Sequence, residues 1–232
     1  AATSNGDGSI TSSVSANTTA GFSIVKYVAN SATVATVGHG LSQAPELIIV
    51  KDRDSAYNWA VYSSALTSAD YALQLNNDLA QTNAYDYWND TDPTASVFTI
   101  GTDLGVNDGT DNFIAYCFHS IEGYSKIDAY EGNFNANGPF VYTGFRPSYI
   151  MRKNIDAPAN WVIQDDKRSP TNPRNYVLLA DTFGAEADWS AYPIDILSNG
   201  FKLRNTGQGT NGAHTFIYLA FAESPFKTSD AR

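Results

Sequence analysis

An internal repeat constrains this 232-residue chain more than any other feature of its sequence. Gly21-Phe22-Ser23 recurs as Gly123-Tyr124-Ser125, an offset of 102 residues, and residues 45–51 (PELIIVK) recur at the same offset as residues 147–153 (PSYIMRK). Self-similarity at a fixed period marks repeated structural units, so the sequence predicts two tandem, internally duplicated units. Further matching pairs, at offsets of 102 or 103, are Asp54 with Asp156, Asn58 with Asn160, Trp59 with Trp161, Phe98 with Phe201, and Phe113 with Phe216.

The repeat sets the expected domain boundaries. Residues 1–20 hold only two large apolar side chains and are predicted to be a linker or an edge segment. Residues 21–122 are predicted to form the first unit and residues 123–227 the second, each of about 100 residues. The polar residues 228–232 are predicted to be a frayed tail.

Short apolar runs between turn clusters favour an all-β fold. Residues 47–50 and 113–118 are continuous apolar runs of strand length, typical of central strands that are covered on both faces. No window shows a helical stripe of useful length. The expected architecture is therefore a β-sandwich or a small barrel in each unit. Strands are predicted in the first unit at 22–28, 47–50, 59–62, 71–75, 97–100 and 113–118, with partners in the second.

The acidic charge balance limits the partners that the chain is expected to bind. The formal net charge is −10 and the pI is near 4.5. Such a chain does not gather phosphates by counterion release, so no nucleic-acid partner is predicted. An anionic membrane surface is disfavoured for the same reason. No stretch approaches the roughly twenty apolar residues of a transmembrane helix, so no membrane insertion is predicted.

Motifs for catalysis are sparse, and the sequence predicts a protein that is not an enzyme and has no catalytic residues. The single cysteine, Cys117, lies in an apolar run, which favours a small buried side chain over a nucleophile. No nucleophile-elbow pattern is present, and neither unit gathers His39, His119 and His214 into a cluster of its own.

One acidic run resembles a calcium ligand set without matching a calcium motif. Residues 103–111 (DLGVNDGTD) are rich in oxygen ligands but lack the alternating spacing of an EF-hand loop. The corresponding residues 205–212 contain no carboxylate. A hydrated hairpin loop is therefore the preferred interpretation. No metal site and no cofactor are predicted, and calcium stays open without support from the sequence.

Aromatic residues on loops are the candidate ligand contacts, because a sugar ring stacks its apolar face on Trp or Tyr while Asp or Asn binds its hydroxyl groups. The main alternative is that a loop tryptophan closes the end of a sandwich core. Trp59 and Trp161 recur in register and are predicted to be core anchors, and the Asp and Asn residues near them are predicted to fix turns. The candidate contact residues are Tyr85, Tyr87, Trp88, Asp90, Trp189 and Tyr192.

The chain resembles a duplicated domain found in tail-fibre-like virion proteins of marine bacteriophages. The resemblance covers nearly the whole chain, from about Gly8 to Lys227, and it supplies no catalytic residues. One departure from it is Arg152, inside an otherwise apolar strand. The stretches that carry the resemblance are 15–25 (SANTTAGFSIV), 37–41 (VGHGL), 45–51, 58–59, 116–118 (YCF), 122–126 (EGYSK), 138–147 (GPFVYTGFRP), 197–204 (LSNGFKLR) and 220–223 (AFAE).

The resemblance implies a virion or extracellular location and contact with a host. The chain is expected to be a structural, receptor-facing module of a bacteriophage tail fibre or related appendage that contributes to host attachment. Its expected partners are other tail subunits and a host cell-surface glycan. A homo-oligomer is expected, with a trimer favoured because fibres are commonly trimeric. The alternative is a carbohydrate-binding module of a secreted bacterial protein.

Overall fold

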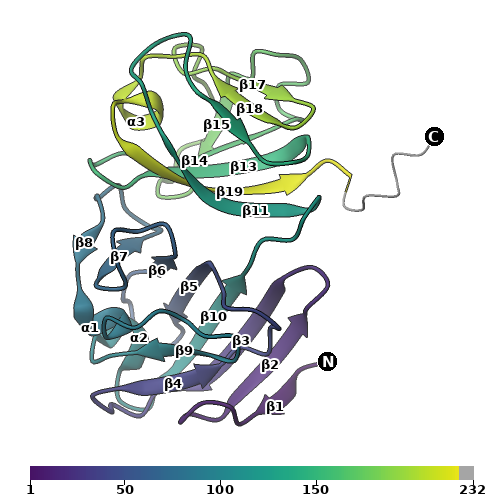
Figure 1. Ribbon diagram of the computed structural model, residues 1–232. Coiled ribbons are helices and arrows are strands. Elements are labelled where there is room, and N and C mark those ends of the chain that lie inside the picture. Colours follow the sequence, from purple (N-terminus) through teal and green to yellow (C-terminus); the bar gives the residue numbers. More distant parts are fainter. Residues whose placement is uncertain (225–232) are drawn as a thin grey trace. The chain divides into compact units, whose positions relative to one another are not determined.

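Antiparallel strands dominate the protein. The computed structural model describes residues 1–224, so the tail predicted at 228–232 lies outside the described residues. Strands hold 42% of the chain and helices 5%, which confirms the predicted all-β class, and the sheets are open rather than closed into a barrel (Figure 1). The chain divides into two compact units. One contains Ala1–Leu75 and Gln81–His119, and the other contains Asn76–Ala80 and the residues from Ser120 onward.

The first unit contains ten strands and two single-turn helices in the described residues. Its strands pair in an eight-stranded sheet of order β1-β2-β3-β10-β5-β6-β7-β8 and a two-stranded sheet, β4-β9. Their bounds are β1 (Thr3–Asn5), β2 (Ser12–Asn17), β3 (Phe22–Val28), β4 (Ala35–Gly38), β5 (Leu47–Asp52), β6 (Ala60–Ser63), β7 (Tyr71–Gln74), β8 (Thr82–Asn83), α1 (Tyr85–Trp88), β9 (Val97–Ile100), α2 (Leu104–Asn107) and β10 (Asn112–Phe118).

The core of the first unit lies between its two sheets. Along β10, Phe113, Ala115 and Cys117 are buried and the residues between them are only half-buried, because successive side chains of a strand point to opposite faces. The prediction that both faces of this strand are fully covered was therefore wrong. Val37 on β4 and Phe98 on β9 belong to the same buried cluster, which gives the unit its sandwich-like form.

Residues 1–20 form edge strands rather than a linker. β1 pairs with β2 and β2 with β3, so the segment extends one edge of the large sheet. Ile10 and Val14 are buried in the core, because the neighbouring strands supply the apolar surface that this polar segment lacks.

The second unit contains nine strands and one single-turn helix in the described residues. Its sheets have the orders β11-β19-β13-β14-β15-β16 and β12-β18-β17. Their bounds are β11 (Ser125–Glu131), β12 (Phe140–Tyr142), β13 (Pro147–Asn154), β14 (Val162–Asp165), β15 (Tyr176–Leu179), β16 (Ala187–Asp188), β17 (Ile194–Leu197), β18 (Gly200–Leu203), α3 (Gln208–Asn211) and β19 (Thr215–Ala222).

The two units share a strand order. β3-β10-β5-β6-β7-β8 of the first unit matches β11-β19-β13-β14-β15-β16 of the second, strand for strand. The Tyr27 and Phe113 rings stack at 5.2 Å, and the Tyr130 and Phe216 rings stack at 5.0 Å. These matches support the internal duplication, which stays a prediction.

A buried asparagine ends one single-turn helix in each unit. The Asn107 side chain, at the end of α2, accepts backbone N–H groups of Asn30 and Ser31 and donates to the carbonyls of Ala32 and Gly101. Asn211 ends α3 and is buried in the same way. The hairpin loop predicted for residues 103–111 was therefore wrong: Asp103 caps a helical turn by accepting the Gly105 N–H at 2.7 Å.

Candidate functional site

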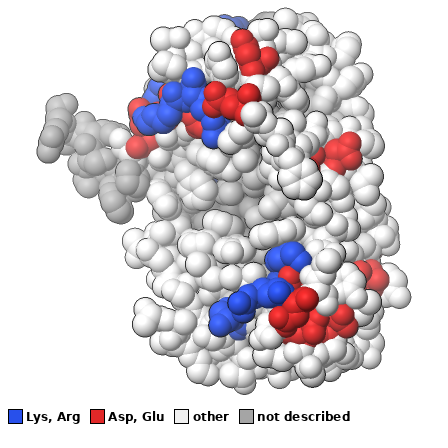
Figure 2. Space-filling model, turned by 180° about the vertical axis from the view of Figure 1, so that it is seen from behind, with Lys and Arg blue, Asp and Glu red and all other residues white. Residues whose placement is uncertain are grey.

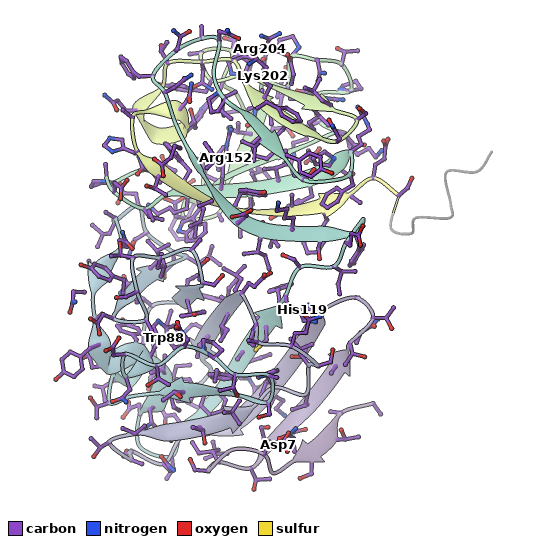
Figure 3. All side chains as sticks on the ribbon, viewed as in Figure 1. Asp7, Trp88, His119, Arg152, Lys202 and Arg204 are labelled. Atoms are coloured by element: carbon purple, nitrogen blue, oxygen red, sulfur yellow. The ribbon has the colours of Figure 1, made fainter. Side chains whose placement is uncertain are left out.

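The structure places Trp88 in the core rather than on a ligand-contacting loop. Trp88 ends the single-turn helix α1 and is 1% exposed, among the side chains inside the first unit (Figure 3). Its ring meets the Tyr62 ring edge-on, with centroids 5.9 Å apart. The prediction of Trp88 as a contact residue was wrong, and the alternative that a loop tryptophan closes the core is confirmed at this position.

The other aromatic candidates of the first unit do not form a site. Tyr87 is half-buried, its hydroxyl oxygen accepts a hydrogen bond from Gln74 Nε2 at 3.2 Å, and burial raises the pKa of its phenol. Tyr85 is 64% exposed. Asp90 is exposed and interacts with Asp70, whose pKa is raised by partial burial and by the Asp90 charge. These contacts give Tyr87 a packing role and leave Tyr85 as an isolated exposed ring.

In the second unit, Trp189 and Tyr192 come together. Their ring centroids lie 5.4 Å apart with the planes at 63°, an edge-to-face arrangement. A tight turn positions them, because the Tyr192 N–H donates to the Trp189 carbonyl at 2.8 Å. The Tyr192 ring lies directly against Gly207, where a Cβ atom would overlap the ring. The structure therefore brings these two candidate residues together, and both rings are partly exposed.

A pocket of about 180 Å³ opens beside these two rings. Asn160 reaches it from the segment before β14, and its amide is oriented by donation to Asp181 Oδ2 at 2.8 Å. The volume is below the roughly 300–1,000 Å³ of sites for drug-sized ligands, so it suits one ring-sized group. The lining residues are Trp189, Tyr192, Pro158, Ala159, Asn160, Val162, Gly209 and Thr210.

The two register-matched tryptophans have different surroundings. Trp161 is 2% exposed, as predicted for a core anchor, but Trp59 is only half-buried, so that prediction was wrong for Trp59. Their main chains do match: the Trp59 carbonyl accepts the Leu75 N–H, and the Trp161 carbonyl accepts the Ala180 N–H. The shared register gives the two tryptophans matching backbone hydrogen bonds. It does not determine how other segments of the chain cover their side chains.

The acidic residues at the loop ends have a structural role, as predicted, but each bonds to a distant strand rather than within its own turn. Asp54 Oδ2 accepts the backbone N–H of Asn112 at 2.7 Å, and Asp156 Oδ2 accepts that of Thr215 at 2.7 Å. Hydrogen bonds from the side-chain amide and from the backbone N–H of Asn112 lower the pKa of the Asp54 carboxyl group. Both carboxylates therefore join a loop to the start of a central strand, β10 or β19.

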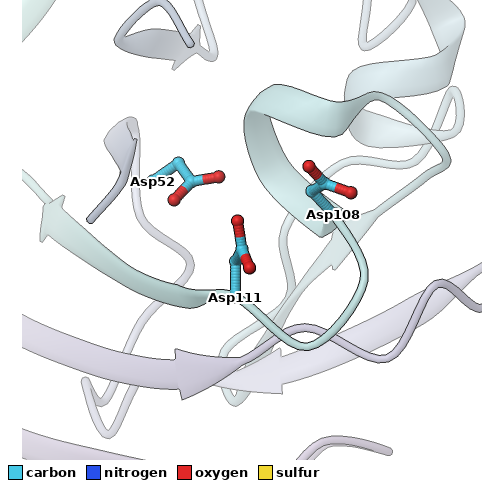
Figure 4. A group of neighbouring side chains, drawn as sticks. All are labelled: Asp52, Asp108 and Asp111. Atoms are coloured by element: carbon cyan, nitrogen blue, oxygen red, sulfur yellow. The ribbon is translucent and has the colours of Figure 1, made fainter. Parts of the chain in front are cut away.

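Three carboxylates of the first unit gather where the sequence analysis preferred a loop without a metal. One oxygen each of Asp52, Asp108 and Asp111 lies within 4.8 Å of the others (Figure 4). Two of these residues belong to the oxygen-rich run 103–111, and Asp52 comes from the end of β5. The sequence reasoning missed this third member because it is distant along the chain.

Comparison with protein families assigns the chain to a family. Residues 1–225 match the family model described as a domain of unknown function, DUF7483. The chain belongs to the DUF7483 family. The match spans both compact units, so one DUF7483 domain contains the two of them. No curated protein and no solved structure matches the chain.

The reactive side chains of this DUF7483 domain serve its packing. Cys117 is fully buried, and burial raises the pKa of its thiol to about 12, which confirms the predicted apolar role. His39 is buried: its Nδ1 accepts the Leu41 N–H and its Nε2 donates to the Thr94 carbonyl. Burial lowers the pKa of His39, so the neutral imidazole is favoured.

Arg152 of the DUF7483 domain is a charged side chain that is buried inside the second unit (Figure 3). There, its Nη2 donates to Gln164 and its charge interacts with Tyr130, and its Nη1 has no partner among the described residues. Gln164 in turn donates to the Arg174 carbonyl at 2.8 Å. In the sequence, this buried charge was indicated only by an arginine within an apolar strand. Arg152 belongs to the polar part of the core.

The surface of the DUF7483 domain is largely uncharged on the face that Figure 2 shows. Lys and Arg side chains on that face lie beside Asp and Glu side chains. Within residues 1–224, no helix is long and apolar enough to cross a membrane.

Proposed function

We propose that this domain is a non-catalytic, receptor-facing structural module of a bacteriophage tail fibre or related virion appendage. The resemblance to tail-fibre-like virion proteins supports the location, and the sandwich-like fold suits a structural part. In this proposal the module contributes to host attachment by contacting a cell-surface glycan.

The observation that carries the proposal is the aromatic pocket of the second unit. Trp189 and Tyr192 present ring surfaces to a space that fits one ring-sized group. Neither the Trp189 indole N–H nor the Tyr192 hydroxyl has a hydrogen-bond partner among the described residues, so both can bond a ligand. The oriented Asn160 amide adds polar groups. An apolar surface with a few placed polar groups is how proteins recognise a sugar ring.

The chemistry of the lining favours binding over turnover. Glycoside hydrolysis usually needs two carboxyl groups flanking the bond. The eight described lining residues include no Asp, Glu, His or Cys. Asp181, the nearest carboxylate in this network, accepts hydrogen bonds from Asn160 Nδ2 and the Trp161 N–H. Asp181 therefore orients Asn160, which is one of the residues that line the pocket.

A glycan array with matched variants tests the pocket. The wild-type domain is expected to bind a subset of glycans, and Trp189→Ala is expected to weaken that binding at least tenfold, or about 1.4 kcal/mol. Tyr85→Ala removes an exposed ring from the first unit and is expected to bind like wild type. Circular dichroism confirms that each variant is folded. Unchanged binding by Trp189→Ala would contradict the assignment of the pocket.

The virion location needs its own measurement. Antibodies to the domain are expected to label phage tails in electron micrographs, and light scattering is expected to show a homo-oligomer, with a trimer favoured. Glycan binding without any association with virions would instead favour the alternative, a carbohydrate-binding module of a secreted bacterial protein. The aromatic pocket supports both functions equally, so location separates them.

A further inference from the structure

Asp52 is a buried carboxylate at the end of β5. It is 1% exposed and lies on the same face of the strand as Ile48 and Val50, which are in the hydrophobic core. Asp52 Oδ1 accepts the backbone N–H groups of Asp54 at 2.8 Å and Ser55 at 2.9 Å. Asp52 Oδ2 is buried as well, and no donor among the described residues bonds to it. This oxygen lacks the partner that its burial demands.

A buried carboxylate oxygen without a partner is costly, because it loses its hydration and no hydrogen bond replaces it. Buried charges in proteins are therefore paired or bound to metals. Among residues 1–224, no Lys or Arg forms an ion pair with Asp52, Asp108 or Asp111. No basic side chain in this part of the chain therefore compensates the charge of the three carboxylates.

Two further carboxylates converge on Asp52. Asp108 follows α2, and Asp111 directly precedes β10. Figure 4 shows the three side chains directed toward one common space. Ser55 Oγ donates to Asp111 Oδ2 at 2.8 Å and so holds that carboxylate in place, and the Tyr57 hydroxyl interacts with Asp108.

The spacing of the three oxygens fits a shared calcium ion. Calcium binds oxygen atoms at about 2.3–2.6 Å, so two ligands on opposite sides of the ion are separated by roughly 5 Å. The three oxygens of the cluster lie within 4.8 Å of one another. Carboxylates alone, without Cys or His, suit a hard cation rather than zinc.

The second unit provides an internal comparison. Asn154 stands where the first unit has Asp52, and its Oδ1 accepts the N–H groups of Asp156 and Ala157 in the same kind of turn. Its Nδ2 donates to the carbonyl of Gln208, the first residue of α3, at 3.2 Å. The second unit thus has an N–H donor where the first has the unpartnered carboxylate oxygen.

The rest of the cluster is also particular to the first unit. At the matched ends of α3 and β19, Gly212 and His214 replace Asp108 and Asp111. In the second unit, the Asn154 amide donates a hydrogen bond at this position. The first unit carries three negative charges there, and a cation is the partner that satisfies them.

We propose that Asp52, Asp108 and Asp111 bind one Ca²⁺ ion in the first unit. Water and backbone carbonyl oxygens would complete the six to eight ligands that calcium takes. The ion would tie the end of β5 to the turn between α2 and β10. Mg²⁺ fits this site less well, since it requires near-ideal octahedral geometry at about 2.0–2.1 Å.

Terbium luminescence tests the site directly. The domain is stripped with EDTA and titrated with Tb³⁺, and Tyr57 beside Asp108 serves as the energy donor. One Tb³⁺ per chain is expected to bind with sensitised emission and to be displaced by Ca²⁺ far more readily than by Mg²⁺. Asp52→Asn is expected to weaken Tb³⁺ and Ca²⁺ binding at least tenfold. Glu131→Gln, which removes one exposed carboxylate from β11, is the matched control and is expected to bind like wild type.

The Asp52→Asn variant is expected to fold, because it places in the first unit the same residue that the second unit has at the matched position, Asn154. The melting temperature of wild type is expected to rise with Ca²⁺ over EDTA, and that of Asp52→Asn to be the same in both. Asp111→Asn gives a second variant with the same expected loss. Absence of saturable binding to wild type, or wild-type affinity in both variants, would overturn the proposal.

Discussion

Replacing Trp88 with alanine tests whether this residue belongs to the core or to a binding surface. Its side chain is 1% exposed and contacts the Tyr62 and Tyr87 rings at centroid distances of 5.9 and 6.1 Å. Truncating a buried tryptophan to alanine costs about 3–5 kcal/mol, from lost burial and the cavity left behind. A domain has a free energy of unfolding of about 5–15 kcal/mol, so Trp88→Ala should remove a large share of it.

Trp88→Phe should cost less, roughly 1–2 kcal/mol, because phenylalanine keeps an aromatic ring in the site. It also removes the Trp88 Nε1–H, which is buried and has no partner among the described residues. The expected order of stability is wild type, then Trp88→Phe, then Trp88→Ala.

Urea unfolding followed by circular dichroism measures these differences. With a denaturant dependence of about 1–3 kcal/mol per molar, Trp88→Ala should lower the urea midpoint by about 1–5 M. Tyr85→Ala, three residues earlier and exposed, should change the free energy of unfolding by no more than about 0.5 kcal/mol. If Trp88→Ala kept the wild-type midpoint but lost glycan binding, the packing argument would be refuted.

Other predictions concern the remaining buried polar groups. Asn107→Ala should destabilise the first unit by about 2–4 kcal/mol in urea unfolding, because it breaks four hydrogen bonds to backbone groups; a change below about 0.5 kcal/mol would show that water replaces them. Arg152→Met should leave stability unchanged or raise it, since the guanidinium is buried and incompletely bonded; a large loss of stability would assign Arg152 a supporting role. Burial lowers the pKa of His39, so as the pH falls through about 6.5 the unfolded chain binds a proton more readily than the folded protein, and the free energy of unfolding decreases. His39→Gln should reduce this pH dependence of stability between pH 7 and 5. Cys117 should resist a thiol reagent at pH 8 until the protein unfolds, because its pKa is raised to about 12; rapid labelling of the native protein would contradict its burial.

The strands were predictable because short apolar runs carry a local signal. The run at 47–50 lies within β5, and 22–28 and 97–100 coincide with β3 and β9. The same pattern did not reveal the single-turn helices, because four residues are too few for a helical period to show. Trp88 was misassigned for this reason, since the side of one helical turn that faces the core depends on distant strands.

The two candidate sites differ in how far sequence could reach them. Trp189 and Tyr192 are neighbours in the chain, so their pairing follows from one turn. The carboxylate cluster depends on the pairing of β5 with β10, which places Asp52 opposite Phe113 and so brings it near Asp111. A repeat alone does not state which strands pair, and this member of the cluster was therefore beyond sequence reasoning.

The contact between Tyr192 and Gly207 limits how this loop can change. Because any larger residue at position 207 would displace the ring, Gly207 can be replaced only if Tyr192 changes as well. Substitutions at Trp189 meet no such restriction from Gly207. If the pocket selects a receptor, new specificities should therefore arise by substitution of Trp189, while Tyr192 and Gly207 stay unchanged.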